Sequence, residues 1–290
     1  MFQHYIITRF NLRRDDWNTT KNNEVVLSDS WLEERFELFE NYCFPSVKNQ
    51  TNQHFKWLVF FDVNTPEIYK SKIEDFVKEY DNFHPFFIDG MKSFIPSIIE
   101  KVDVLDTEKY IITSRLDNDD CIHQDYTSVV QSFFDKQDYM AIDVTGGYGM
   151  EVGNKIKLGK MLHLYNPYIS LIERKERVKT VWHKGHTHWK YERNILEVKN
   201  KHLWLTIIHE KNKSNKFRGF GKVKRTILDE FNISSSISKS LIDRMVDYKL
   251  WYFDSFKNKF YLLSAYYGKK IKKQIGFYRL KSLFAKNRFD

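Results

Sequence analysis

The first half of the chain alternates short apolar runs with polar or amphipathic stretches. Five of the apolar runs have the length and composition of buried strands. Parallel strands need crossover connections of a dozen or more residues, usually helices. The alternation therefore predicts an α/β fold, Rossmann-like, with a mainly parallel sheet and helices on both faces. The predicted strands cover residues 4–10, 55–61, 83–88, 110–113 and 139–144.

The amphipathic stretches between these runs predict four helices. Ser30 and Glu33 have the capping-box spacing, and apolar residues follow at helical spacing, which predicts a helix over 31–43. Thr65 followed by Pro66 is typical of an N-cap and a first-turn proline, and it predicts a second helix reaching residue 80. The other two expected helices cover 94–102 and the stretch from Asp125, as N-cap, to 134.

Composition narrows the class of protein. The chain has 290 residues, of which 42% are hydrophobic, with 11 Gly and 5 Pro, so it is a packed globular protein and neither disordered nor collagen-like. Its two cysteines, Cys43 and Cys121, form no disulfide framework and no zinc-ribbon spacing, which favours a cytoplasmic protein. Beyond residue 222 the pattern becomes helical and basic. We therefore predict a domain over 1–221 and a helical basic extension over 222–290.

The net charge of +9 is concentrated in two places. Residues 266–290 hold eight Lys/Arg against one acid, interleaved with aliphatic and aromatic side chains, and residues 211–225 hold seven Lys/Arg and no acid. A basic amphipathic segment of this composition is typical of attachment to an anionic membrane surface, here the inner face of the membrane. A solvated helix face and a nucleic-acid site are the alternatives; with no nucleic-acid module in the sequence, no nucleic-acid partner is expected.

An acidic cluster directly follows the predicted strand 110–113. Asp117, Asp119 and Asp120 stand within four positions, and such carboxylates repel one another unless a cation lies among them. Oxygen ligands favour Mg²⁺ or Mn²⁺. Arg115 beside them could hold a phosphate through two hydrogen bonds. The alternative is an exposed turn, but in parallel sheets ligands bind beyond the carboxyl ends of strands, where this cluster is expected.

Several motifs, in order, resemble a known family. The letters S-V-K-N-Q-T at 46–51 and V-F-F-D-V-N-T at 59–65 resemble the opening of the family 2 glycosyltransferases, and R-L-D-N-D-D at 115–120 resembles their metal motif. Together with T-R-F-N at 8–11, W-L-x-x-R-F at 31–36 and Y-C-x-P-S at 42–46, they resemble the rhamnosyltransferase family. The resemblance covers about residues 1–215. It implies a GT-A fold and a nucleotide-sugar donor.

The resemblance also implies roles for individual residues. Asp117 and Asp119 would hold Mn²⁺ or Mg²⁺ and the donor diphosphate, while Thr8, Arg9 and Asp62, at the ends of the first two strands, would face the nucleotide. Arg115 would contribute to donor binding. The glycines Gly146 and Gly147 match a glycine-bearing loop near donor and acceptor; a plain tight turn is the alternative.

The position of the catalytic base departs from the family pattern. Where a carboxylate usually precedes an arginine, this chain has a histidine-rich stretch, so the base that deprotonates the acceptor is either His188 or Glu192. His186 and His188 lack the partners of a zinc site. His209 matches a histidine that joins the metal in many GT-A enzymes; a histidine bonded to backbone at a strand end is the alternative.

These observations predict a metal-dependent glycosyltransferase. It would move a sugar, rhamnose by the family resemblance, from a nucleoside diphosphate donor to a hydroxyl of a glycan or lipid-linked glycan in polysaccharide synthesis. A glycoside hydrolase, which needs two carboxylates and no metal, and a non-catalytic nucleic-acid-binding protein are the rival hypotheses.

Overall fold

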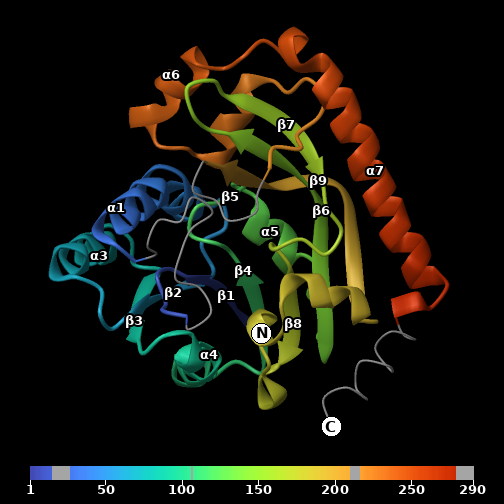
Figure 1. The fold of residues 1–290 in the computed structure, drawn as a ribbon. Helices are drawn as coiled ribbons and strands as arrows, with labels where there is room; N and C mark the ends of the chain where they lie inside the picture. The colour runs from blue at the N-terminus through green and yellow to red at the C-terminus, as the bar shows by residue number, and fades with distance from the viewer. Residues whose placement is uncertain (15–26, 106, 210–215, 279–290) are drawn as a thin grey trace.

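The protein is described here from a computed structural model, which covers residues 1–14, 27–105, 107–209 and 216–278. Over these residues it forms one nine-stranded sheet in the order β3-β2-β1-β4-β8-β6-β9-β5, with β7 paired to β6 (Figure 1). The strands are β1 (Phe2–Arg9), β2 (Lys56–Asp62), β3 (Phe83–Ile88), β4 (Tyr110–Arg115), β5 (Cys121–Ile122), β6 (Tyr139–Glu151), β7 (Lys157–Leu162), β8 (Ser170–Arg174) and β9 (Ile195–Ile208).

The predicted strands are confirmed, and four of them form the parallel half of the sheet. β3, β2, β1 and β4 are all paired in parallel, and β6 pairs in parallel with β9. β8 enters between β4 and β6 and is antiparallel to both, while β7 folds back on β6 as a hairpin. The β6 strand continues to Glu151, beyond the predicted end at residue 144.

Helices cover both faces of the parallel half, as expected. Ile6 of β1 packs into a cluster with residues of α1, α3 and α5, whereas its neighbours Tyr5 and Ile7 pack with α4 on the other face. This alternation follows from the two-residue period of a strand. The helices are α1 (Asp29–Leu38), α2 (Phe44–Lys48), α3 (Glu67–Glu79), α4 (Phe94–Val104), α5 (Tyr126–Gln131), α6 (Ser235–Asp243) and α7 (Tyr252–Gln274), with a π-helical turn at Phe39–Cys43 and short 3₁₀ turns, among them η5 (His186–Tyr191).

The helix starts and ends correct several predictions. The first helix begins at Asp29, and its cap is Ser28, whose hydroxyl accepts a hydrogen bond from the Trp31 amide at 3.4 Å, so Ser30 is not the cap. It is also not one helix to residue 43: the chain widens into the π-helical turn before Pro45, which has no amide hydrogen to donate. The Thr65 hydroxyl donates to the Asp62 carbonyl instead of capping α3.

The fourth predicted helix is shorter than expected. It ends at Gln131 rather than at 134, and Asp125 occupies the N-cap position without a capping hydrogen bond. Its carboxylate accepts from the Thr51 hydroxyl instead, at 2.9 Å.

The described residues after 222, which are 223–278, are mostly helical, as predicted, and pack on β6 and β9. Leu228, Phe231 and Leu241 share a hydrophobic cluster with Met150 of β6 and Leu205 of β9. The long helix α7 runs down the outer side of the molecule beside the β6–β9 half (Figure 1). The division into domains at 221/222 stays a prediction. In the described residues, no helix combines the length and apolar character needed to cross a membrane.

Candidate functional site

A cavity of about 380 Å³ lies at the carboxyl ends of β1 and β4. These strands are parallel neighbours, so their last residues, Arg9 and Arg115, emerge side by side at one edge of the sheet. The acidic cluster follows β4 directly and lines the same cavity, as the sequence predicted. The cavity lining includes Arg9, Arg35, Arg115, Asp117, Asn118, Asp119, Asp120, His163, Tyr168, His186, Trp204, Thr206 and Lys216.

Asp119 is held between two basic side chains. Arg35 of α1 donates from Nη1 to Asp119 Oδ2 at 2.7 Å, and His209 Nε2 lies 3.3 Å from the same oxygen. All three side chains are largely buried, with 12%, 12% and 6% of their area exposed for Arg35, Asp119 and His209. On its other side the His209 ring lies 3.4 Å from the Glu34 carboxylate.

These contacts move the pKa values of both partners. Burial alone would raise the pKa of Asp119, but the Arg35 charge and the His209 hydrogen bond outweigh it and hold this pKa well below its usual range. Burial alone would lower the pKa of His209, but Asp119 and Glu34 outweigh it and raise this pKa. An ionised carboxylate next to a protonated imidazole is the state that the arrangement favours.

Asp120 faces inward and is fixed by two donors. The Tyr168 hydroxyl donates to its Oδ2 at 2.6 Å, and the Ile207 amide of β9 donates to its Oδ1 at 2.9 Å. Burial, and then repulsion from the Asp119 charge, raise the pKa of Asp120 well above the ordinary value. Tyr168 is itself held by stacking on Trp204, with ring centroids 4.8 Å apart.

Arg115 presents a buried cation to the cavity. Its guanidinium lies 4.0 Å over the Trp182 ring, and its Nη2 is 3.3 Å from both Asp117 oxygens. Its Nε is buried and has no hydrogen-bond partner among the described residues. Arg9 approaches the same indole ring, at 5.4 Å. Two guanidinium groups around one tryptophan form an electropositive wall that suits a phosphate.

Two residues predicted to face the nucleotide lie away from this cavity. Thr8 is fully buried, and its hydroxyl accepts a hydrogen bond from Trp57 Nε1 at 3.0 Å. Asp62 is 2% exposed, and its carboxylate accepts from the amide of Arg13 at 3.1 Å and from Arg13 Nε at 2.9 Å. Neither residue lines the cavity, whereas Arg9, Arg115 and Asp117 of the same predicted set do.

The glycines Gly146 and Gly147 lie inside β6, which corrects their assignment to a loop or a tight turn. The pairing of β6 with β9 is irregular around them. A Cβ at Gly147 would lie 2.1 Å from the Trp204 ring, and one at Gly146 would lie 2.3 Å from the Lys201 carbonyl oxygen. The missing side chain at Gly147 therefore gives space to Trp204, on which Tyr168 stacks.

The histidine-rich stretch reaches the cavity through a different residue from those predicted. His186 lines the cavity, whereas His188 is exposed and packs near Tyr191. Glu192 also lies away from the cavity: its carboxylate is 3.0 Å from Lys184 Nζ and accepts from the Tyr139 hydroxyl at 3.2 Å. Burial, followed by the nearby charge of Arg115, lowers the pKa of His186 to about 4.

Arg35, His186 and Trp204 are site residues that the sequence analysis did not select. Arg35 belongs to the W-L-x-x-R-F motif of the family resemblance, which is the signal that could have selected it. Its partner Asp119 is 84 residues away in the chain, so spacing alone does not indicate the contact. A lone arginine on an amphipathic helix is typical of a solvated position. Trp204 lies in a strand that the sequence analysis did not predict.

The donor chemistry of the cluster suits a divalent cation. Carboxylate oxygens of Asp117 and Asp119 and the neutral imidazole of His209 are ligands that Mn²⁺ accepts. His209 Nε2 lies 3.3 Å from Asp119 Oδ2, so the ring would have to give up the proton of that contact to bind an ion. Within the described ranges, no three His, Cys, Asp or Glu side chains are already arranged around such a position. Arg35 already forms an ion pair with Asp119. A metal ion bound to Asp119 would therefore share this carboxylate with Arg35 or displace the guanidinium.

The fold and this strand-end site define an α/β protein with a charged ligand cavity at the edge of its parallel strands. The chain matches the family described as "Putative rhamnosyl transferase" over residues 3–220, and it belongs to that family. Among curated proteins none matches it.

Solved structures with partial similarity include two of S. aureus TarS 1–349. The complex with UDP has a TM-score of 0.41 at 12% identity, covering 71% of this chain and 60% of that one. The complex with UDP-GlcNAc has a TM-score of 0.40 at 12% identity, covering 83% of this chain and 72% of that one. A "putative nucleotide-diphospho-sugar transferase" from Desulfovibrio desulfuricans G20 has a TM-score of 0.39 at 12% identity, covering 85% and 100%. This chain thus spans less than two thirds of the first TarS chain.

Proposed function

We propose that this protein is a glycosyltransferase that takes its sugar from a nucleoside diphosphate donor. The observation that carries the proposal is the cavity itself, in which Arg9 and Arg115 face the acidic cluster at the ends of β1 and β4. Guanidinium groups suit the diphosphate, and the carboxylates suit a cation that would accompany it. The family name supports rhamnose as the sugar. The acceptor is a hydroxyl of a glycan or a lipid-linked glycan.

Asp117, Asp119 and His209 are the residues that would hold Mn²⁺ or Mg²⁺. When bound, the cation supplies positive charge that stabilises the departing diphosphate. Arg115, whose side chain lines the same cavity, would donate hydrogen bonds to the same leaving group. Asp120 keeps the cluster in place through Tyr168 and the Ile207 amide.

The base that takes the acceptor proton is proposed to come from the 186–192 segment. His186 lines the cavity and is the first candidate; His188 and Glu192 are the alternatives, one exposed and one held by Lys184. The charge of Arg115 contributes to the lowered pKa of His186. An anionic diphosphate bound beside Arg115 would offset that charge and make the imidazole a better base.

The test is an assay of nucleoside diphosphate release from UDP-, dTDP-, GDP- and CDP-sugars, with Mn²⁺ or with EDTA. We expect release from one donor class that EDTA abolishes and that added Mn²⁺ restores. In the Asp119→Asn variant this release should fall by at least about a hundredfold, because a neutral amide replaces the charged oxygen that would contact the metal. Sugar hydrolysis from glycosides that persists in EDTA would support a glycoside hydrolase and contradict the proposal.

We further propose that α7 attaches the cytoplasmic enzyme to the inner face of an anionic membrane. Five large apolar side chains follow one another along its outward face at helical spacing and are 55–79% exposed: Phe253, Phe256, Phe260, Tyr267 and Ile271. Ser255, Leu262 and Tyr266 on the opposite face are buried against the protein. Lysines flank the apolar stripe, which fits anionic headgroups. Residues 279–290 of the predicted basic segment, and 211–215 of the second basic run, lie outside the described residues.

Co-sedimentation with vesicles of phosphatidylcholine and phosphatidylserine tests this attachment. The Phe256→Ser/Phe260→Ser variant should lose most of its binding. The control Ile68→Ser/Val104→Ser removes two similarly exposed apolar side chains, at 71% and 76%, from other helices and should bind as the wild type does. Equal binding by both variants would contradict the proposal.

A further inference from the structure

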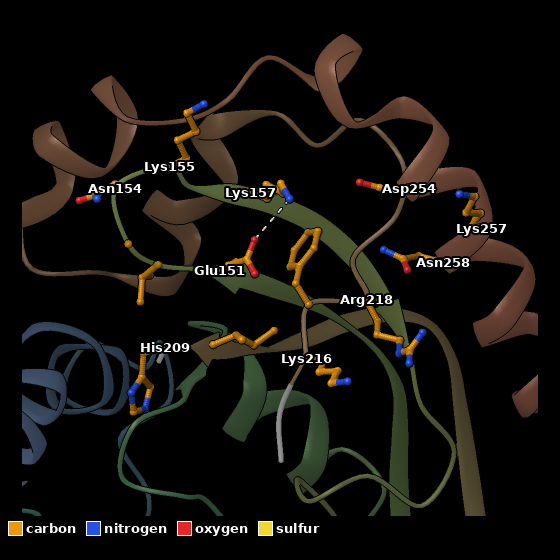
Figure 2. Close-up of a pocket in the computed structure, with 14 residues that line it drawn as sticks. Glu151, Asn154, Lys155, Lys157, His209, Lys216, Arg218, Asp254, Lys257 and Asn258 are labelled. Atoms are coloured by element: carbon orange, nitrogen blue, oxygen red, sulfur yellow. Dashed lines mark ion pairs between the residues drawn. The ribbon is translucent and has the colours of Figure 1, made fainter. Parts of the chain in front are cut away.

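A second cavity, of about 760 Å³, opens beside the strand-end site. It lies between the β6–β7 hairpin, the end of β9 and the first turns of α7 (Figure 2). The two cavities adjoin, because Ile208 and Lys216 line both. His209, which lines the second cavity, also contacts Asp119 of the first. A long ligand lying in the second cavity would therefore reach the acidic cluster.

The second cavity is strongly cationic. Five basic side chains line it against two carboxylates, Glu151 and Asp254. Lys157 is the cation paired with a lining carboxylate, with its Nζ 3.5 Å from Glu151 Oε2 (Figure 2). In the described part of the chain, no carboxylate forms an ion pair with the other four. The five basic residues are Lys155, Lys157, Lys216, Arg218 and Lys257.

Aromatic rings orient two of these cations. The Arg218 guanidinium lies 4.0 Å over the Tyr261 ring of α7, and Lys157 Nζ lies 5.9 Å from the Phe217 ring. Figure 2 shows the basic side chains coming from three separate segments around one opening: the hairpin, the 216–218 segment and α7. Cations that line one cavity from separate segments, and that have no carboxylate partner among the described residues, suit a ligand with several negative charges.

We propose that this cavity binds the phosphate groups of the acceptor, which makes the acceptor a phosphate-bearing glycan. The inference rests on the proposed function and names its substrate class. Phosphates would lie along Lys155, Arg218 and Lys257, and the acceptor hydroxyl would extend past Lys216 to the acidic cluster. In the transfer, that hydroxyl oxygen bonds to the anomeric carbon, the bond from this carbon to the diphosphate oxygen breaks with its electron pair on the diphosphate, and the hydroxyl proton goes to the base.

Two sources share this chemistry: a chain joined by phosphodiesters and a glycan on a lipid diphosphate. Binding is measured with a synthetic glycerol phosphate oligomer and with polyprenyl diphosphate in neutral phosphatidylcholine vesicles. A saturating nucleoside diphosphate with Mn²⁺ is present throughout, so that the strand-end cavity is filled. The probe that binds the wild-type protein identifies the source, and binding of either one, with the dependence on variants described next, supports the inference.

The variant Lys155→Gln/Arg218→Gln/Lys257→Gln removes three cations of this cavity. Its control, Lys70→Gln/Lys72→Gln/Lys78→Gln, makes the same charge change on α3, far from the cavity lining. We expect the cavity variant to bind the probe at least about tenfold more weakly, and the control to bind it as the wild type does. Both variants should keep the wild-type affinity for the nucleoside diphosphate.

Three outcomes overturn the inference. Equal probe affinity in the two variants would show that phosphate binds outside this cavity. If the wild-type protein binds neither probe, the acceptor is not a phosphate-bearing glycan. A neutral oligosaccharide that competes as well as the charged probes would also contradict it. These failures differ from a failure of the proposed function, because that failure appears as absent nucleotide binding in the wild-type protein.

Discussion

Arg35 Nη1 lies 2.7 Å from Asp119 Oδ2, and this ion pair joins the first helix to the loop that follows β4. The guanidinium also lies over the Trp31 ring, at 5.0 Å, and its Nη1 is 3.3 Å from the Asn118 side chain. A buried cation thus already neutralises the carboxylate that the sequence assigns to a metal. The pair stabilises the cluster in the form described here and competes with a divalent ion for the same oxygen.

Replacing Arg35 should therefore lower the stability of the protein and raise its affinity for a metal ion. Arg35→Gln leaves a buried carboxylate without its main partner, so the free energy of unfolding should fall by about 2 kcal/mol. The same change should strengthen Mn²⁺ binding, measured by electron paramagnetic resonance of free Mn²⁺, because the competing cation is gone. Lys48→Gln, which breaks a more exposed pair with Glu79, should cost less than about 1 kcal/mol and leave Mn²⁺ binding unchanged. Weaker Mn²⁺ binding by Arg35→Gln would contradict the competition.

The glycine at 147 should not tolerate a methyl group. Gly147→Ala would bring a Cβ to 2.1 Å from Trp204, so the ring must shift, at a cost of about 2 kcal/mol, and disturb its stack with Tyr168. Gly268→Ala in α7 meets no atom within 4 Å and should be neutral or stabilising by up to about 1 kcal/mol. Urea unfolding of both variants measures the contrast. A Gly147→Ala protein as stable as the wild type would contradict it.

His4 should make the protein less stable in mild acid. Its ring is fully buried beside Ser114, at 2.8 Å, and burial lowers its pKa to about 3. The unfolded histidine takes up a proton below about pH 6.5, whereas the folded one does not. The contribution of His4 to the free energy of unfolding therefore falls by about 2 kcal/mol between pH 7.5 and pH 5. Urea unfolding at both pH values should show that His4→Gln removes this part of the loss. His54→Gln, at an exposed histidine, should keep the wild-type dependence.

The choice of base can be made by comparing three variants. If His186 is the base, His186→Ala should lower kcat by about a hundredfold or more while His188→Ala stays within about threefold of the wild type. Glu192→Gln should act mainly on stability, because Glu192 holds Lys184 and Tyr139. Measured kcat values decide among them. A large loss with His188→Ala and none with His186→Ala would restore the interpretation made from the sequence.

The strand pattern allowed the parallel half of the sheet and the place of the acidic cluster to be predicted, because both follow from local signals. Apolar runs of strand length predicted β1 to β4 and the start of β6, and the carboxylates of 117–120 are adjacent in the chain. The β8 and β9 strands were not predicted, because β8 has only five residues, two of them charged, and β9 is interrupted by a polar run at 199–202.

Contacts between distant segments could not be predicted in the same way. The ion pair of Arg35 with Asp119 and the space that Gly147 gives to Trp204 depend on how helices and strands pack, which no spacing in the chain records. The error at residues 146–147 has a similar cause. Glycines usually indicate a turn, but here the close approach of the Lys201 carbonyl to Gly146 and of Trp204 to Gly147, both from β9, leaves no space for a Cβ inside the strand.

The central claim is that the acidic cluster, with a cation, binds a nucleoside diphosphate. The most direct measurement is a thermal-shift screen of the wild-type protein and Asp119→Asn with UDP, dTDP, GDP and CDP, each with and without Mn²⁺. A ligand at about 100 times its Kd adds about 2.7 kcal/mol, which raises the Tm by about 5 °C in a chain of this size. We predict that shift for one diphosphate with Mn²⁺ and its loss in Asp119→Asn. The claim is contradicted if no diphosphate shifts the wild-type Tm, or if both proteins shift equally.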